Sequence, residues 1–188
     1  MLRTRLGWSW KHKAVALSLS ATLSGVAAGA ALGAAGEAVG SSVRAIAVPA
    51  IGCVALMLTA ADVLGRPIMP PQRNVETPYR LFQAGGMTWA VATGAILGLG
   101  ATTRIEFWLW YLVPLGAFLS GDPLAGLLIY GTYALLRTAA APAIVVAARE
   151  TGLDVFGRIL MRQLPFARAS ARLELALAGV ALVLMSWI

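Results

Sequence analysis

The sequence is poor in the residues that catalytic and metal chemistry require. Its 188 residues include one cysteine, Cys53, and one histidine, His12. One residue of each type excludes an internal disulfide, a CxxC redox pair and a Cys/His zinc cluster, and His12 lies in the basic N-terminal arm, away from any buried serine. We therefore predict no catalytic residue, no metal site and no cofactor, and the sequence favours a function other than catalysis. Cys53 lies in an apolar run, so we interpret it as a small buried hydrophobic residue.

Charge is also scarce. Only 12% of the residues are charged and 59% are hydrophobic, which is too little charge to cover a soluble globule of this size. The net charge of +7 comes from basic residues at the ends of apolar segments, and no basic patch is interleaved with aromatics as nucleic-acid binding requires. The predicted partners are membrane lipids, including anionic headgroups, and not nucleic acid.

Apolar runs are what the sequence has in abundance. The first, residues 14–35, supplies the roughly 20 helical residues that cross a bilayer core of about 30 Å, so we interpret it as a retained transmembrane helix and not as a signal core. Further runs follow at 45–64, 84–101, 107–119, 124–148 and 175–188. We predict an all-α polytopic transmembrane bundle of about five or six helices, in which the first two form a helical hairpin.

We predict a single membrane domain over residues 1–188. Its parts are a first repeat at about 14–64, a cytoplasmic loop at 65–83, a second repeat at about 84–148, a basic loop at 149–174 and a final helix at 175–188. The positive-inside rule places the basic N-terminus and both loops in the cytoplasm. We therefore predict a multi-pass protein of the inner membrane. An even number of crossings must then separate the two loops, so one of the three apolar pieces between them is predicted to be a broken or re-entrant helix.

The two halves of the chain resemble one another. A shift of 65 residues aligns VAAGAALG (Val26 to Gly33) with VATGAILG (Val91 to Gly98), identical at six of eight positions, and also aligns Val48-Pro49 with Val113-Pro114. Proline is scarce inside helices, so its recurrence favours an internal duplication. Duplicated halves are common in transporters, where the site lies between the repeats.

Glycines recur at helical spacing inside these runs. Gly25, Gly29 and Gly33 are spaced by four residues, and Gly94 and Gly98 repeat that spacing in the second half. Such strips let another helix backbone approach closely, so we predict that these five glycines are helix-packing residues.

Two charged positions interrupt the apolar runs and suggest a site. Arg104 stands between the third and fourth runs and is either an interfacial side chain at an exposed turn or, with Thr102 and Thr103, part of a polar pocket that holds an anion at a helix end. Arg137 has about a dozen apolar residues on each side, so it requires a partner inside the bundle. Asp122 and Asp62 are the available carboxylates, for a buried structural pair or for a role in substrate or proton movement.

The stretches GAILGLGATTR and GDPLAGLLIYGTYALLR, joined by a broken apolar helix, resemble the membrane domains of the cytochrome c biogenesis and thiol-disulfide carrier family, the CcdA/DsbD group. The resemblance covers residues 84–148 and, more faintly, 14–64. It implies a duplicated architecture with broken helices. Members of that family carry electrons through one cysteine in each repeat, and the second repeat here has none, so the resemblance does not extend to electron transfer.

The sequence thus predicts a small inner-membrane protein of transporter or carrier type, with a polar site between two related halves. The predicted substrate-binding residues are Thr102, Thr103, Arg104, Asp122 and Arg137. The alternative is a structural or assembly subunit of a homo-oligomer or larger membrane complex. A third, less favoured, function is that of a membrane enzyme acting on a lipid-linked substrate through the arginine-rich cytoplasmic face.

Overall fold

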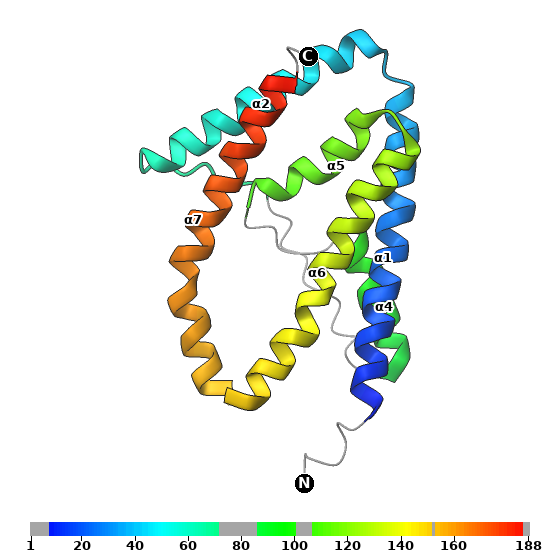
Figure 1. Cartoon of the computed structure of the whole chain (residues 1–188), viewed down its shortest axis with the longest axis vertical. Helices are drawn as coiled ribbons and strands as arrows, with labels where there is room; N and C mark the ends of the chain where they lie inside the picture. The colour runs from blue at the N-terminus through cyan, green and yellow to red at the C-terminus, as the bar shows by residue number, and fades with distance from the viewer. Residues whose placement is uncertain (1–7, 72–85, 101–106, 152, 186–188) are drawn as a thin grey trace.

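The computed structural model describes residues 8–71, 86–100, 107–151 and 153–185, and within these ranges the chain is helical with no strand. The six helices are α1 (Trp8–Glu37), α2 (Ser41–Val63), α4 (Gly86–Leu99), α5 (Leu109–Ser120), α6 (Pro123–Thr151) and α7 (Leu153–Met185), as Figure 1 shows. The predicted all-α class is confirmed within these ranges, which hold six helices.

Local chemistry explains where two of these helices meet. Gly121 follows α5 with φ of 56°, a left-handed conformation that glycine adopts without steric cost. The next residue, Asp122, accepts a hydrogen bond through Oδ1 from the Leu124 backbone N–H at 2.9 Å. An aspartate in this position satisfies one of the free amide groups at a helix start, so Gly121 and Asp122 together end α5 and begin α6.

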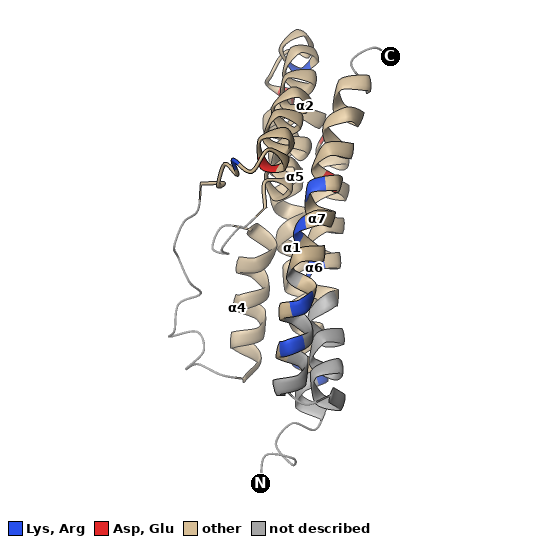
Figure 2. Cartoon of the chain, turned by 90° about the vertical axis from the view of Figure 1, so that its left-hand side faces the viewer, with Lys and Arg blue, Asp and Glu red and all other residues tan. Residues whose placement is uncertain are grey.

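The predicted basic loop at 149–174 is wrong, because this segment is helical. α6 continues to Thr151, and α7 carries both the basic segment and the final apolar run in one helix of 33 residues. At 100° per residue, Arg158, Arg162, Arg168 and Arg172 fall within an arc of about 120°. The basic residues of α7 therefore lie on one side of the helix, and Figure 2 shows basic positions recurring along α7.

α1 forms the centre of a tightly packed group with α4 and α6 (Figure 1). α6 runs antiparallel to α1. α4 runs parallel to α1, since Leu17 lies against Gly94 and Ala21 against Gly98. α2 crosses beyond the end of α1 and packs against α7.

The predicted hairpin of the first two helices is wrong, because α1 and α2 make no packing contact within the described chain. The small residues of α1 are covered by α4 and α6. In α2 the close contact is made by Gly52, which lies against Gly179 of α7. α1 and α2, which are neighbours in the sequence, therefore pack against different helices.

Small residues allow these helices to approach closely. A Cβ atom on Gly29 would overlap the carbonyl oxygen of Gly126, and one on Gly25 would lie 2.6 Å from the Cβ of Ala134. The other glycines predicted to pack helices lie at similar contacts: Gly33 against Asp122, Gly94 against Leu17 and Ser20, and Gly98 against Ala21 and Ser24. Ser24 adds a hydrogen bond from Oγ to the Ala95 carbonyl at 3.0 Å.

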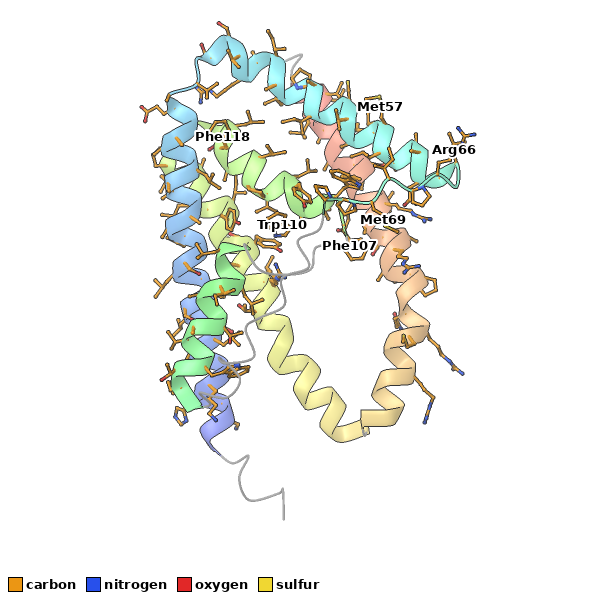
Figure 3. The ribbon with its side chains drawn as sticks, turned by 180° about the vertical axis from the view of Figure 1, so that it is seen from behind. Met57, Arg66, Met69, Phe107, Trp110 and Phe118 are labelled. Atoms are coloured by element: carbon orange, nitrogen blue, oxygen red, sulfur yellow. The ribbon has the colours of Figure 1, made fainter. Side chains whose placement is uncertain are left out.

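The large apolar side chains of the described chain point mainly outward, while alanines such as Ala21 and Ala134 fill the core (Figure 3). Leu23 of α1 is 68% exposed. The accessible surface is 12,507 Å², against about 8,600 Å² for a compact soluble protein of this mass. Cys53 is exposed as well, which overturns its interpretation as a buried residue.

α1 and α2 are long and apolar enough to cross a membrane, judged by length and composition. α4 and α5 have 14 and 12 residues, lengths of about 21 and 18 Å at 1.5 Å per residue. Neither reaches across a hydrocarbon core of about 30 Å.

The segments aligned by the 65-residue shift fall on corresponding helices. The first pair lies on α1 and α4, which run parallel, and the second on α2 and α5, with Pro49 and Pro114 inside them. Each aligned pair therefore lies on two helices, while the second predicted repeat also contains most of α6.

Candidate functional site

Of the five predicted site residues, Asp122 and Arg137 lie within the described residues, and their side chains have different hydrogen-bond partners. Thr102, Thr103 and Arg104 lie outside the described residues. Asp122 is exposed and starts α6.

Arg137 finds a partner on its own helix. It is half-buried on α6, donates a hydrogen bond from Nη1 to the Tyr133 hydroxyl at 2.7 Å, and places its guanidinium 5.8 Å from the centre of the Tyr133 ring. Both interactions have the i to i+4 geometry of a helix face. The sequence-based choice of Asp122 or Asp62 as its partner is wrong for the described residues, because each carboxylate is engaged elsewhere.

The end of α4 lies against α6. The Tyr130 hydroxyl donates to the Leu99 carbonyl at 2.9 Å, which satisfies an acceptor at the end of α4. Gly100 follows with φ of 68°, and a Cβ atom there would overlap the Trp110 ring. Side chains from α5 and α6 therefore cover the backbone of Leu99 and Gly100 at the end of α4.

A groove of about 440 Å³ opens elsewhere, between α2, α5 and α7. Its walls are formed by the end of α2, the extended segment 67–70, the start of α5 and the middle of α7. The lining residues are Leu58, Thr59, Asp62, Pro67, Ile68, Met69, Pro70, Phe107, Trp108, Leu109, Arg168, Ala171, Arg172 and Leu175. Met69 and Phe107 lie next to one another on this wall (Figure 3). The volume falls within the range of small-molecule sites.

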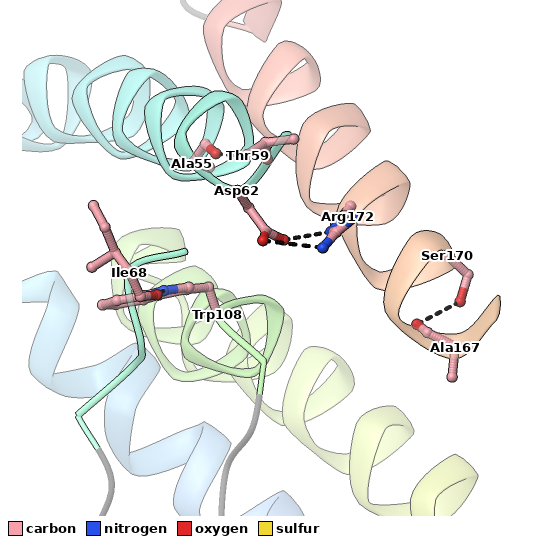
Figure 4. Close-up of polar contacts among 8 residues, drawn as sticks. All are labelled: Ala55, Thr59, Asp62, Ile68, Trp108, Ala167, Ser170 and Arg172. Carbon is pink, nitrogen blue, oxygen red and sulfur yellow. Dashed lines mark hydrogen bonds and ion pairs between the residues drawn. The ribbon is translucent and has the colours of Figure 1, made fainter. Parts of the chain in front are cut away.

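The charged part of the groove is an ion pair beside an additional cation. Arg172 donates to Asp62 through two nitrogens, Nε to Oδ2 at 2.5 Å and Nη2 to Oδ1 at 3.1 Å (Figure 4). Their side chains are 44% and 28% exposed, so the pair contributes only about 0–1 kcal/mol to stability. Arg168 lies one turn before Arg172, is exposed, and has no carboxylate partner among the described residues. Two guanidiniums and one carboxylate leave a charge of +1.

Two aromatic side chains of the fourth apolar run donate hydrogen bonds to the segment that forms the outer wall of the groove. The Trp108 indole donates from Nε1 to the Ile68 carbonyl at 2.7 Å, and the Tyr111 hydroxyl donates to the Pro71 carbonyl at 2.5 Å. We call residues 67–71 the strap. Trp108 is thus bound to a segment 40 residues away in the sequence (Figure 4).

Most of this groove is not predicted from the sequence. The sequence predicts Asp62 only as a partner for Arg137, and it predicts a loop for Arg168 and Arg172. The angular clustering of the α7 arginines was a signal for a helix, but the pairing of Asp62 with Arg172, 110 residues apart, has no signature in a single sequence.

No family model, curated protein or solved structure matches this chain.

Proposed function

We propose that this chain is a small multi-pass inner-membrane protein of transporter or carrier type, with a cytoplasmic N-terminus, whose polar site is the groove between α2, α5 and α7. The observation that carries the proposal is the position of the groove. One wall, α2, comes from the first predicted repeat, and another, the start of α5, comes from the second. Transporter sites typically lie between related halves.

The outward apolar surface supports a lipid environment. Leu19 and Leu23, one turn apart on α1, are 59% and 68% exposed, and large contiguous apolar patches are rare on soluble monomers. Lipid is the environment in which such a surface has no hydration cost.

An internal duplication with parallel repeats is part of the proposal. The aligned segments fall on α1 and α2 and, in the same order, on α4 and α5, and both α2 and α5 contain a proline, which supports it. The short α4 and α5 also fit the duplicated, broken-helix architecture of the thiol-disulfide carriers that the sequence resembles, without their electron chemistry.

The groove combines a cationic end with apolar walls, so its chemistry favours an anionic ligand. Arg168 has its guanidinium free of described partners, and Arg172 uses only part of its hydrogen-bonding capacity on Asp62. An arginine fork in a partly enclosed site is well suited to an anion.

Paired cysteine labelling in intact membranes tests the proposal. In a Cys53→Ser background, Thr59→Cys lies in the groove, and Leu19→Cys is the matched control on the outward face of α1. A membrane-impermeant maleimide should label position 59 and leave position 19 unlabelled, because lipid covers the latter. Labelling at 19 with none at 59 would overturn the proposal.

A structural or assembly subunit is the second candidate. The observation that favours it concerns Arg137, a charged residue with apolar residues on both sides. Its side chain binds within its own helix and does not line the groove. A charge engaged in this way is a packing element and not part of a substrate path. If neither position 59 nor position 19 is labelled, this second function leads.

A further inference from the structure

We propose that the groove binds an anionic phospholipid, with the headgroup phosphate at Arg168 and Arg172 and one acyl chain along the apolar wall. This inference rests on the proposed membrane placement of the chain and names the ligand class of the same groove. It follows from the number of hydrogen-bond donors, the charge and the wall chemistry of the described lining residues.

Arg172 keeps donors in reserve. A guanidinium carries five N–H groups, and Asp62 occupies one on Nε and one on Nη2. Three remain on Arg172, and none of the five on Arg168 has a partner among the described residues. The net charge of +1 at this end of the groove matches a ligand with one negative charge, such as a phosphodiester.

The two arginines suit a phosphate better than a carboxylate. Arg168 and Arg172 stand on successive turns of α7, so their guanidiniums approach a ligand from different heights. The oxygens of a tetrahedral phosphate point in divergent directions and can accept from both, whereas one planar fork satisfies a planar carboxylate.

The remaining walls are suited to an acyl chain. Leu58, Met69 and Phe107 contribute apolar surface, and the strap contains Pro67 and Pro70, which have no backbone N–H to offer a polar ligand. A polar substrate would leave these surfaces without partners, while a chain entering from the bilayer would cover them. Met69 is 80% exposed, so covering it removes a large apolar side chain from water.

Native mass spectrometry of the full-length protein tests the assignment. The protein is incubated with phosphatidylcholine vesicles that contain a minor fraction of phosphatidylglycerol, extracted in mild detergent, and scored for each bound lipid. The variants are Arg168→Gln in the groove and Arg158→Gln as the matched control. The control removes the same charge from the same side of α7 but does not line the groove.

We expect the wild-type protein to retain phosphatidylglycerol in preference to phosphatidylcholine. Arg168→Gln should weaken that retention about tenfold through loss of charge-assisted hydrogen bonds, and Arg158→Gln should not. Asp62→Asn should strengthen it several-fold, because it removes the competing carboxylate. General damage to the fold would lower retention in both groove variants, so the opposite signs separate ligand binding from instability.

Equal losses in Arg168→Gln and Arg158→Gln would overturn the assignment in favour of diffuse attraction to the membrane surface. Displacement of the lipid by millimolar inorganic phosphate would overturn it in favour of a free anion. If either occurs while Thr59→Cys is still labelled, the carrier proposal stands without its lipid ligand. If Thr59→Cys is unlabelled but retention depends on Arg168, the lipid site stands and the carrier proposal falls.

Discussion

At the scale of single residues, the close packing of the helices depends on glycines, which have no side chain at the contact. Gly29 and Gly126 lie so close that a Cβ on either would overlap the carbonyl oxygen of the other. In a lipid environment, where apolar burial does not drive helix association, this close backbone packing is a main source of attraction.

Gly29→Ala should therefore destabilise the protein, by about 1–3 kcal/mol as typical overpacking does, measured by thermal unfolding in detergent. Gly116→Ala is the matched control, since a Cβ there meets nothing within 4 Å. The control should be neutral or slightly stabilising, because alanine is the better helix former. Equal effects of the two substitutions would show that the contact between α1 and α6 is not tight.

Arg137 illustrates how a conspicuous residue can be structural. Since it binds Tyr133 and does not line the groove, Arg137→Met should leave the labelling of Thr59→Cys and the retention of phosphatidylglycerol unchanged. Thermal unfolding should shift by no more than the loss of one hydrogen bond, about 0.5–1.5 kcal/mol for a neutral pair and up to about 3 with the charge. Loss of lipid retention in a folded Arg137→Met protein would place this residue in the site.

At the scale of elements, the strap is held by one hydrogen bond from Trp108, the residue before α5, and one from Tyr111 in the first turn of α5. Trp108→Phe removes the bond to the Ile68 carbonyl, which is worth about 0.5–1.5 kcal/mol, so the strap should open about two- to tenfold more often. The readout is the rate of maleimide labelling of Pro70→Cys, a buried position.

Tyr111→Phe should act in the same direction, because it removes the bond to Pro71. Tyr133→Phe, which leaves the strap bonds intact, is the control and should not change the labelling rate. A rate that is the same in all three variants would contradict the described attachment of the strap.

Helix positions were largely predictable from the sequence, and helix partners were not. The apolar run 107–119 became α5 (Leu109–Ser120) and the run 124–148 lies within α6 (Pro123–Thr151), because apolar composition and flanking turn residues decide where a helix forms. The choice of neighbour depends on which small residues face one another in space. This is why α2 packs on α7 and not on α1.

The groove was not predictable from the sequence for the same physical reason. Arg137 stands out in the sequence because it lies inside an apolar run, whereas Asp62 and Arg172 lie near the ends of such runs and are far apart in sequence. Reading the α7 arginines as a loop also removed the periodicity that would have placed them on one side of a helix. The predictions for Thr102, Thr103 and Arg104 stay untested.

At the scale of the whole molecule, the protein is an open arrangement in which two groups of helices are joined by few contacts. α1, α4 and α6 form one packed group, and α2 packs with α7 in another (Figure 1). Arg44 links the start of α2 to the end of α5 through a hydrogen bond to the Ser120 carbonyl at 3.1 Å. The groove lies where the second group meets the start of α5, so relative movement of the groups would change its width.

Arg44→Gln should favour that movement, since a side chain with fewer and weaker donors holds the Ser120 carbonyl less well. We expect thermal stability to fall slightly, by about 1 kcal/mol, and the labelling rate of Thr59→Cys to rise. Arg66→Gln, an exposed arginine with no described ion pair, is the charge-matched control and should change neither quantity.

The most direct test of the carrier function is the sidedness of access to the groove. Thr59→Cys in a Cys53→Ser background is labelled with an impermeant maleimide in right-side-out and in inside-out membrane vesicles. A carrier opens its site to each side in turn, so labelling in both preparations is the predicted result. Labelling from one side only, with the protein folded in both, would contradict the carrier function and leave a fixed binding site on one face of the membrane.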